Sequence, residues 1–204
     1  MTCTKCPRLA AFIEENKIKF PTFFNAPVPP FGDPDARLLI VGLAPGLKGA
    51  NQTGRPFTKD YAGDLLYPTL IKFGWAKGQY KADPNDGLQL TGALIANAVR
   101  CVPPQNKVTP DEMKTCNPLL QEQIRNLPHL KIIMALGTVA HNAVLYAFGY
   151  KQSAYKFGHG AVHHLPNGLV LIDSYHCSRY NTNTGVLTPD MFEDIFRTIK
   201  EHTR

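Results

Sequence analysis

Residues 36–60 read ARLLIVGLAPGLKGANQTGRPFTKD. The apolar run at 36–41 predicts a buried parallel strand that ends at Gly42. The loop at 42–60 holds four glycines and two prolines, so its backbone can turn tightly and lie close to a ligand. Apolar residues at helical spacing follow at 65–73. A strand, a glycine-rich loop and a helix in this order place a binding loop at the carboxyl end of a parallel sheet. The alternative is an ordinary surface loop. A Walker-type phosphate loop is excluded because no Gly-Lys-Ser/Thr follows at the required spacing.

Strands and helices alternate along the rest of the chain. We expect further strands at 91–99, 131–136, 161–165 and 169–173. One helix is expected around Leu9, and three more at 109–126, 138–148 and 188–202. This alternation predicts an α/β fold, namely a three-layer α/β/α sandwich with a mostly parallel central sheet. The sequence has no internal repeat or interdomain linker, so we expect a single domain over residues 1–204.

Composition limits the class of protein. A chain of 204 residues with 44% hydrophobic content can bury a substantial core. The formal net charge of +6 favours an anionic partner such as nucleic acid. No apolar run is long enough to cross a membrane, and the first residues contain no apolar signal core. We therefore expect a monomeric cytoplasmic protein with no membrane partner.

Four of the five cysteines form two groups. Cys3 and Cys6 make a Cys-x-x-Cys pair, and Cys101 is separated from Cys116 by fourteen residues. In a reducing compartment this pattern indicates metal binding rather than disulfides. Four thiolates suit either a [4Fe–4S] cluster or a Cys₄ zinc site, and the wide second spacing favours the cluster. The alternative is four unrelated buried thiols. Cys177 is left over.

Three polar segments follow predicted strands, at 42–60, 97–100 and 174–184. Because the carboxyl ends of parallel strands meet at one edge of a sheet, we expect these segments to gather there. No Ser-His-Asp order, strong carboxylate pair or lysine suited to Schiff-base chemistry stands out.

Several side chains in and near these segments are candidates for chemistry. His176 can act as a general acid or donate a hydrogen bond to a developing anion. Asn97 can read a base edge or cap a strand end, and Phe57 can stack on a ligand or fold into the core. His141 lies on an apolar helix and is expected to be a packed core residue. The predicted hairpin contains His159, His163 and His164. Their side chains should point apart, so we do not expect them to bind a metal.

Together these segments resemble the uracil-DNA glycosylase superfamily, most closely its family-five branch. GLAPG at 42–46 resembles the first catalytic motif, and GANQTGRPFTKD at 49–60 resembles its continuation. NAVRCVPP at 97–104 and HCSRYNTNTG at 176–185 resemble the other two signatures of the superfamily. The cysteine pattern is that of the cluster-bearing branches. The resemblance covers residues 3 to about 189.

The resemblance implies a monofunctional enzyme that hydrolyses the N-glycosidic bond of uracil, and of other deaminated bases such as hypoxanthine, in DNA for base excision repair. The target nucleotide is flipped into a pocket. By similarity, Phe57 stacks on the base, Asn97 bonds its Watson–Crick edge, and His176 donates to a uracil carbonyl. The first motif supplies further substrate-binding residues: Gly42, Leu43 and Ala44. The loop after the histidine enters the minor groove through Ser178, Arg179, Tyr180 and Asn181. The resemblance also implies a [4Fe–4S] cluster on Cys3, Cys6, Cys101 and Cys116.

The chain departs from the superfamily pattern at two positions. Ala44 stands where other branches carry an acid that positions water. We expect Asn51 to orient the water in its place, with Asp60 as the second candidate. Cys177 follows His176 where the superfamily usually has proline, which would stiffen the loop.

Two other functions compete with this interpretation. A catalytically weak or inactive DNA protein of the same fold could bind lesions without cleaving them, and Ala44 and Cys177 favour it. A small iron–sulfur electron carrier would need an exposed, reducible cluster and no DNA affinity. The basic charge and the base-pocket residues Phe57, Asn97 and His176 argue against the carrier.

Overall fold

The computed structural model describes residues 3–203 and contains a central six-stranded sheet. The strand order is β1-β5-β2-β6-β8-β7. Four neighbouring strands are parallel and carry the apolar runs: β2 (Leu38–Gly42), β5 (Ala93–Asn97), β6 (Ile132–Leu136) and β8 (Val170–Ser174). Two short antiparallel strands cover the edges, β1 (Phe31–Gly32) and β7 (Val162–His164).

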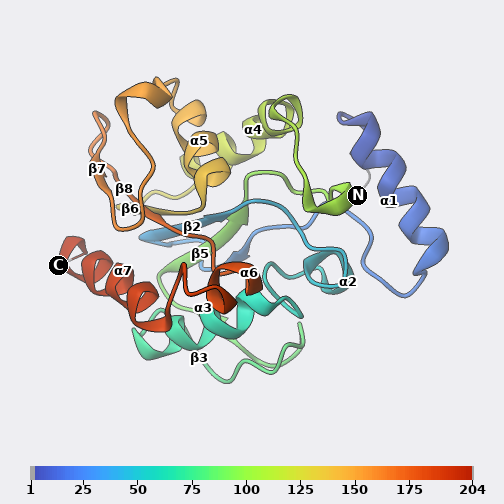
Figure 1. Ribbon diagram of the computed structural model, residues 1–204, viewed down its shortest axis with the longest axis horizontal. Helices are drawn as coiled ribbons and strands as arrows, with labels where there is room; N and C mark the ends of the chain where they lie inside the picture. Colours follow the sequence, from blue (N-terminus) through green and yellow to red (C-terminus); the bar gives the residue numbers. More distant parts are fainter. Residues whose placement is uncertain (1–2, 204) are drawn as a thin grey trace.

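Helices cover both faces of the sheet (Figure 1). One layer contains α1 (Pro7–Lys19), α4 (Pro110–Arg125) and α5 (Thr138–Ala147), and the other contains α3 (Tyr61–Lys72) and α7 (Pro189–His202). The predicted three-layer α/β/α sandwich with a mostly parallel sheet is thus confirmed.

Strand β2 is continuously apolar because the sheet is covered on both faces. Leu39 and Val41 face the core that includes α1, α4 and α5, whereas Leu38 and Ile40 face the core beneath α3 and α7. Successive side chains of a strand point to opposite faces, so a strand buried on both sides needs apolar residues at every position.

Short elements interrupt the loops that the sequence predicted as irregular. The glycine-rich loop contains α2 (Ala50–Thr53), and the polar loop after β8 contains α6 (Arg179–Asn183). The remaining small elements are β3 (Ala76–Lys77), β4 (Gln89–Leu90), η1 (Pro104–Asn106) and η2 (Gln152–Ala154). No helix within residues 3–203 is long and apolar enough to cross a membrane.

Candidate active site

A pocket of about 330 Å³ opens at the carboxyl ends of the parallel strands. Four loops contribute to its wall: the glycine-rich loop, the ends of β5 and β8, and the segment at 103–106. The three polar segments therefore gather at one edge of the sheet, as predicted. The lining residues are Leu43, Ala44, Pro45, Gly46, Ala50, Phe57, Asp60, Asn97, Pro103, Asn106, His176 and Ser178.

Phe57 and Asn97 lie close together at the floor of this pocket. A Cβ atom on Gly42 would come within 2.6 Å of both the Asn97 Oδ1 and the Phe57 Cζ. Gly42 itself does not line the pocket. Because glycine has no side chain, the Asn97 amide and the Phe57 ring can both approach the end of β2. Phe57 has a φ of 55°, and its carbonyl oxygen accepts a hydrogen bond from the Tyr80 hydroxyl at 3.2 Å. The ring is therefore held by a backbone conformation that few side chains adopt.

A buried ion pair braces the loop behind Phe57. Arg55 donates two hydrogen bonds to the Asp86 carboxylate, at 2.8 and 2.9 Å, and the exposed fractions of the two side chains are 5% and 0%. Its guanidinium also lies within 6 Å of the rings of Phe31, Tyr67 and Tyr80. The hydrogen bonds from Arg55 hold the pKa of Asp86 well below its usual range. Sequence reasoning missed this brace, because nothing in the spacing of Arg55 and Asp86 indicates that they meet.

His176 also lines the pocket, and its ring centroid lies 6.1 Å from that of Phe57. Burial lowers the pKa of His176, and the charge of Asp60 only partly opposes this effect. The imidazole is therefore neutral at pH 7 and suited to donating one hydrogen bond. Its backbone is fixed by Asn181, whose amide nitrogen donates to the His176 carbonyl oxygen at 2.8 Å.

Among the described residues 3–203, Asp60 is the one carboxylate that lines the pocket. It caps α3, since its Oδ1 accepts from the Ala62 amide at 3.4 Å. Its Oδ2 lies against the glycine-rich loop, where a Cβ atom on Gly46 would sit only 3.1 Å away. Gly46 therefore allows this carboxylate to lie against the loop at the pocket wall.

Asn51 occupies a different place from the one its predicted role requires. It is fully buried in α2 and does not line the pocket, whereas its neighbour Ala50 does. The Asn51 Nδ2 donates to the Asn25 Oδ1 at 2.9 Å, and its own Oδ1 is buried with no hydrogen-bond partner in the structure.

Comparison with known proteins decides the family. Residues 29–200 match the sequence profile of the Uracil DNA glycosylase superfamily. The chain belongs to this superfamily. It is 44% identical to a type-5 uracil-DNA glycosylase of Thermus thermophilus, over 97% of this chain and 92% of the relative. It is 41% identical to the type-5 enzyme of Mycobacterium bovis, over 98% and 77%, and 35% identical to that of Pyrobaculum aerophilum, over 97% and 87%. The resemblance drawn from the motifs is confirmed.

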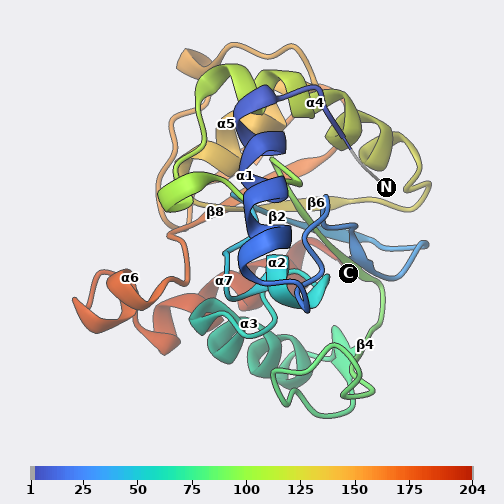
Figure 2. The same ribbon diagram turned by 90° about the vertical axis from the view of Figure 1, so that its right-hand side faces the viewer.

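The third superfamily signature folds into a projecting helix. Ser178 caps α6, its Oγ accepting from the Asn181 amide at 3.4 Å. The Tyr180 side chain is 74% exposed, and the Arg179 guanidinium lies 5.1 Å from the centroid of the Tyr61 ring. Figure 2 shows α6 extending away from the body of the molecule.

Cys3, Cys6, Cys101 and Cys116 line one small pocket between α1, the end of β5 and α4. The Arg100 amide donates to the Cys116 Sγ at 3.4 Å. Burial and the neighbouring thiols raise the pKa of Cys101 to about 12. Within residues 3–203, the only three potential ligand atoms that all lie within 4.8 Å of one another belong to His141, His163 and Asp173. The four cysteines therefore line one small pocket, but their sulfur atoms are not among the ligand atoms that gather within this distance.

Proposed function

We propose that this chain is a monofunctional DNA glycosylase that hydrolyses the N-glycosidic bond of uracil in DNA, and that it also accepts other deaminated bases such as hypoxanthine. The observation that carries the proposal is the meeting of Phe57, Asn97 and His176 in one pocket, in a chain belonging to the Uracil DNA glycosylase superfamily. The type-5 names of its relatives support the same reaction. Removal of deaminated bases is the first step of base excision repair.

The substrate is a flipped nucleotide. A cavity of about 330 Å³ admits one base, whereas a paired base inside a duplex cannot reach it. Stacking on the Phe57 ring holds the base, and stacking on an aromatic side chain contributes about 1–3 kcal/mol per base. The Asn97 amide offers both a donor and an acceptor, which matches the alternating acceptor and donor on the edge of uracil.

The reaction breaks the bond between C1′ of the sugar and N1 of the base. Its electron pair leaves with the base, so negative charge develops on the uracil ring and its carbonyl oxygens. The neutral His176 donates a hydrogen bond to one of these oxygens and stabilises the leaving anion. Water adds to C1′, and the proton that it loses is ultimately taken up by the uracil anion, giving free uracil and an abasic site.

We assign the orientation of the water to Asp60, and give Asn51 a supporting role. Asp60 lines the pocket, whereas both side-chain polar atoms of Asn51 are shielded from it: one donates to Asn25 and the other is buried. An ionised carboxylate near the reacting sugar also balances the positive charge of an oxocarbenium-like state. Ala44 leaves the first motif without a carboxylate of its own.

Contact with DNA is assigned to α6 and the flanking loop. We expect the ring of Tyr180, which is exposed, to enter the minor groove and fill the space left by the flipped nucleotide. We expect Arg179 and Ser178 to contact the DNA backbone, and Asn181 to contribute by fixing the loop. The net charge of +6 makes binding dependent on salt.

We further propose that Cys3, Cys6, Cys101 and Cys116 hold a [4Fe–4S] cluster. When bound, the cluster supplies four cationic iron centres that stabilise thiolates which burial otherwise keeps protonated. The four cysteines would then link α1 to α4 and to the segment after β5 through the cluster. This function is structural, and we expect a monomeric cytoplasmic protein.

Base release under single-turnover conditions tests the proposal. Duplex oligonucleotides carrying one uracil, hypoxanthine or thymine opposite guanine are incubated with excess protein, and abasic sites are revealed by alkali cleavage. Release of uracil and hypoxanthine but not thymine is expected. No release from uracil, with tight and salt-dependent binding, would instead identify a lesion-binding protein without glycosylase activity.

A further inference from the structure

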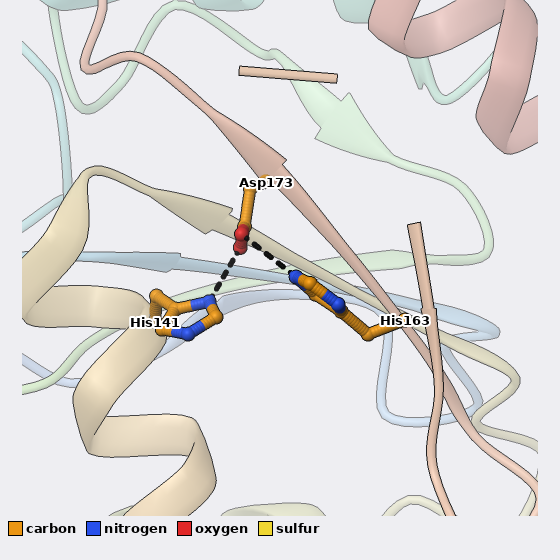
Figure 3. A group of neighbouring side chains, drawn as sticks. All are labelled: His141, His163 and Asp173. Carbon is orange, nitrogen blue, oxygen red and sulfur yellow. Dashed lines mark hydrogen bonds and ion pairs between the residues drawn. The ribbon is translucent and has the colours of Figure 1, made fainter. Parts of the chain in front are cut away.

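Three polar side chains meet beside β8, the strand that precedes His176 (Figure 3). Asp173 lies on β8, His141 on α5 and His163 on β7. The His141 Nδ1 is 2.8 Å from the Asp173 Oδ1, and the His163 Nε2 is 3.2 Å from the Asp173 Oδ2. The exposed fractions of these side chains are 1% for His141, 0% for Asp173 and 14% for His163.

The contacts of His141 determine how many protons the group holds. Its Nε2 lies 2.9 Å from the Tyr155 carbonyl oxygen, which can only accept, so Nε2 carries a proton. A neutral ring would then present the lone pair of Nδ1 to the Asp173 Oδ1 at 2.8 Å, which is repulsive. A second proton must therefore lie between these two atoms.

The second proton belongs to His141 and not to Asp173. The Asp173 Oδ2 accepts a hydrogen bond from the Gly158 amide at 3.4 Å and lies 3.2 Å from the His163 Nε2, so two nitrogen atoms face this oxygen. A carboxyl group is also the stronger acid by more than two pKa units in model peptides. His141 is then an imidazolium, with both N–H groups bonded to oxygen.

Asp173 lies three residues before His176, and hydrogen bonds from neighbouring elements hold this strand end from two sides. On one side, the Gly137 amide at the start of α5 donates to the Ser174 carbonyl oxygen at 2.9 Å. On the other, the Asp173 amide donates to the Ala161 carbonyl oxygen at 3.0 Å, and the Tyr175 amide donates to the His159 Nδ1 at 3.1 Å.

We propose that His141, Asp173 and His163 form a buried charged network, with His141 as a doubly protonated imidazolium, that positions the backbone segment carrying His176. They are positioning residues, because their side chains do not line the base pocket. The protonation state is independent of the proposed glycosylase function, and only the positioning effect rests on it.

The surroundings of His141 support a charged ring. Its polar and aromatic neighbours are Asp173, His163, Tyr155 and the edge of Phe157, so Asp173 is the single acidic group among the contacts recorded for this side chain. Burial alone lowers the pKa of His141, but the hydrogen bond and charge of Asp173 outweigh it and the net pKa is raised. The network therefore stabilises the fold fully below the ordinary histidine pKa of about 6.5 and loses this contribution as pH rises through the raised value.

A divalent metal ion is the competing occupant, since the three ligand atoms lie within 4.8 Å of one another. The two histidines bond to different oxygens of Asp173 at hydrogen-bond distances. Zinc would need nitrogen and oxygen atoms at about 2.0–2.2 Å from a common point. The observed contacts favour a proton.

Nitrogen-15 NMR of the histidine rings in the cluster-loaded protein tests the protonation state directly. At pH 7, both His141 nitrogens should give the chemical shifts of protonated ring nitrogens, with assignment by loss of these signals in His141→Asn. A chelator and added Zn²⁺ should leave them unchanged. One unprotonated His141 nitrogen, or displacement of its proton by Zn²⁺, would overturn the proposal.

Two variants of Asp173 separate charge from position. Asp173→Asn keeps the shape and can hydrogen-bond to a neutral His141, so the loss of stability at rising pH should disappear. Asp173→Ala removes the link and should lower the single-turnover rate about 10- to 100-fold, because misplacement by about 1 Å can cost 10²-fold. The affinity for uncleaved DNA should stay unchanged.

His164→Gln is the matched control, since His164 neighbours His163 on β7 but is exposed and contacts His202 instead. It should match the wild type in rate and in pH dependence. A wild-type rate for Asp173→Ala, or an unchanged pH dependence for Asp173→Asn, would overturn the network. If the wild type releases no uracil, the proposed function fails, but the NMR result still decides the network.

Discussion

The rings of His176 and Phe57 lie 6.1 Å apart, at 33° to each other, and both line the same pocket. A base stacked on Phe57 would lie within reach of His176, as the proposed reaction requires. Phe57 comes from the loop after β2 and His176 from the loop after β8. The parallel sheet brings together two side chains that are far apart in the sequence.

The pH dependence of base release should follow His176. Burial lowers its pKa, so the ring stays neutral as pH falls through the ordinary histidine pKa of about 6.5. We expect the titration of His176 to change the single-turnover rate only below about pH 6.5, where the ring protonates. His176→Asn should lower the rate about 10²- to 10³-fold, the usual effect of losing one donor to an oxyanion, and should abolish this low-pH change. A low-pH change that survives in the variant would contradict this role.

Asp60 and Asn51 should differ sharply when they are replaced. Asp60→Asn removes the carboxylate that lines the pocket and should lower the single-turnover rate about 10²- to 10⁴-fold. Asn51→Ala should keep most of the rate and instead lower the midpoint of thermal unfolding, because it breaks the hydrogen bond to Asn25. If Asn51→Ala lost most of the rate and Asp60→Asn kept it, the orientation of the attacking water would have to be assigned to Asn51.

Gly42→Ala should impair the pocket without unfolding the protein. The added methyl group would meet the Asn97 Oδ1 and the Phe57 ring at 2.6 Å, so both must shift. We expect at least a tenfold loss of the single-turnover rate, by analogy with other displacements of about 1 Å. Gly158→Ala is the control, since a Cβ there makes only an ordinary contact of 3.8 Å with Ala161. Equal rates for the two variants would show that Gly42 is not needed for this approach.

The ion pair between Arg55 and Asp86 should be important for stability. Asp86→Asn leaves a buried guanidinium without its partner and should lower the free energy of unfolding by about 3–5 kcal/mol. The pKa of Asp86 is depressed, so this contribution is present above the ordinary aspartate pKa of about 3.9 and is lost as pH falls toward the folded value. Urea unfolding at pH 7 and at pH 3 measures both effects. A variant as stable as the wild type at pH 7 would contradict the assignment.

Cys101 and Cys177 provide a matched pair of buried thiols. Cys101→Ser should reduce iron content, visible absorbance and the yield of folded protein, because Cys101 lines the four-cysteine pocket. Cys177→Ser should leave iron content and absorbance unchanged, since Cys177 lies next to His176 and outside that pocket. Equal iron content in the two variants would contradict the cluster assignment.

The sequence predicted the layers and the base pocket because both depend on local patterns. Apolar runs such as 36–41 identified the parallel strands, and their carboxyl ends had to meet at one edge. The four-residue helix at Ala50–Thr53 was missed, because a single turn has no periodicity to detect. It buries Asn51 and keeps this residue out of the pocket lining, which is why we propose Asp60 rather than Asn51 for the water.

Side-chain partnerships across the fold could not be predicted. His141 was correctly expected to be buried, but its partner Asp173 is 32 residues away and comes from another element. The same holds for Arg55 and Asp86. Such pairs depend on tertiary geometry, which one sequence without an alignment does not reveal.

Detection of free uracil is the most direct test of the central claim. A duplex with one uracil opposite guanine is incubated with excess wild-type protein, and the base and the strand are followed separately by mass spectrometry. We predict one free uracil for each substrate molecule and an intact strand that breaks only after alkali treatment. Absence of free uracil, or strand cleavage without alkali, would contradict a monofunctional glycosylase.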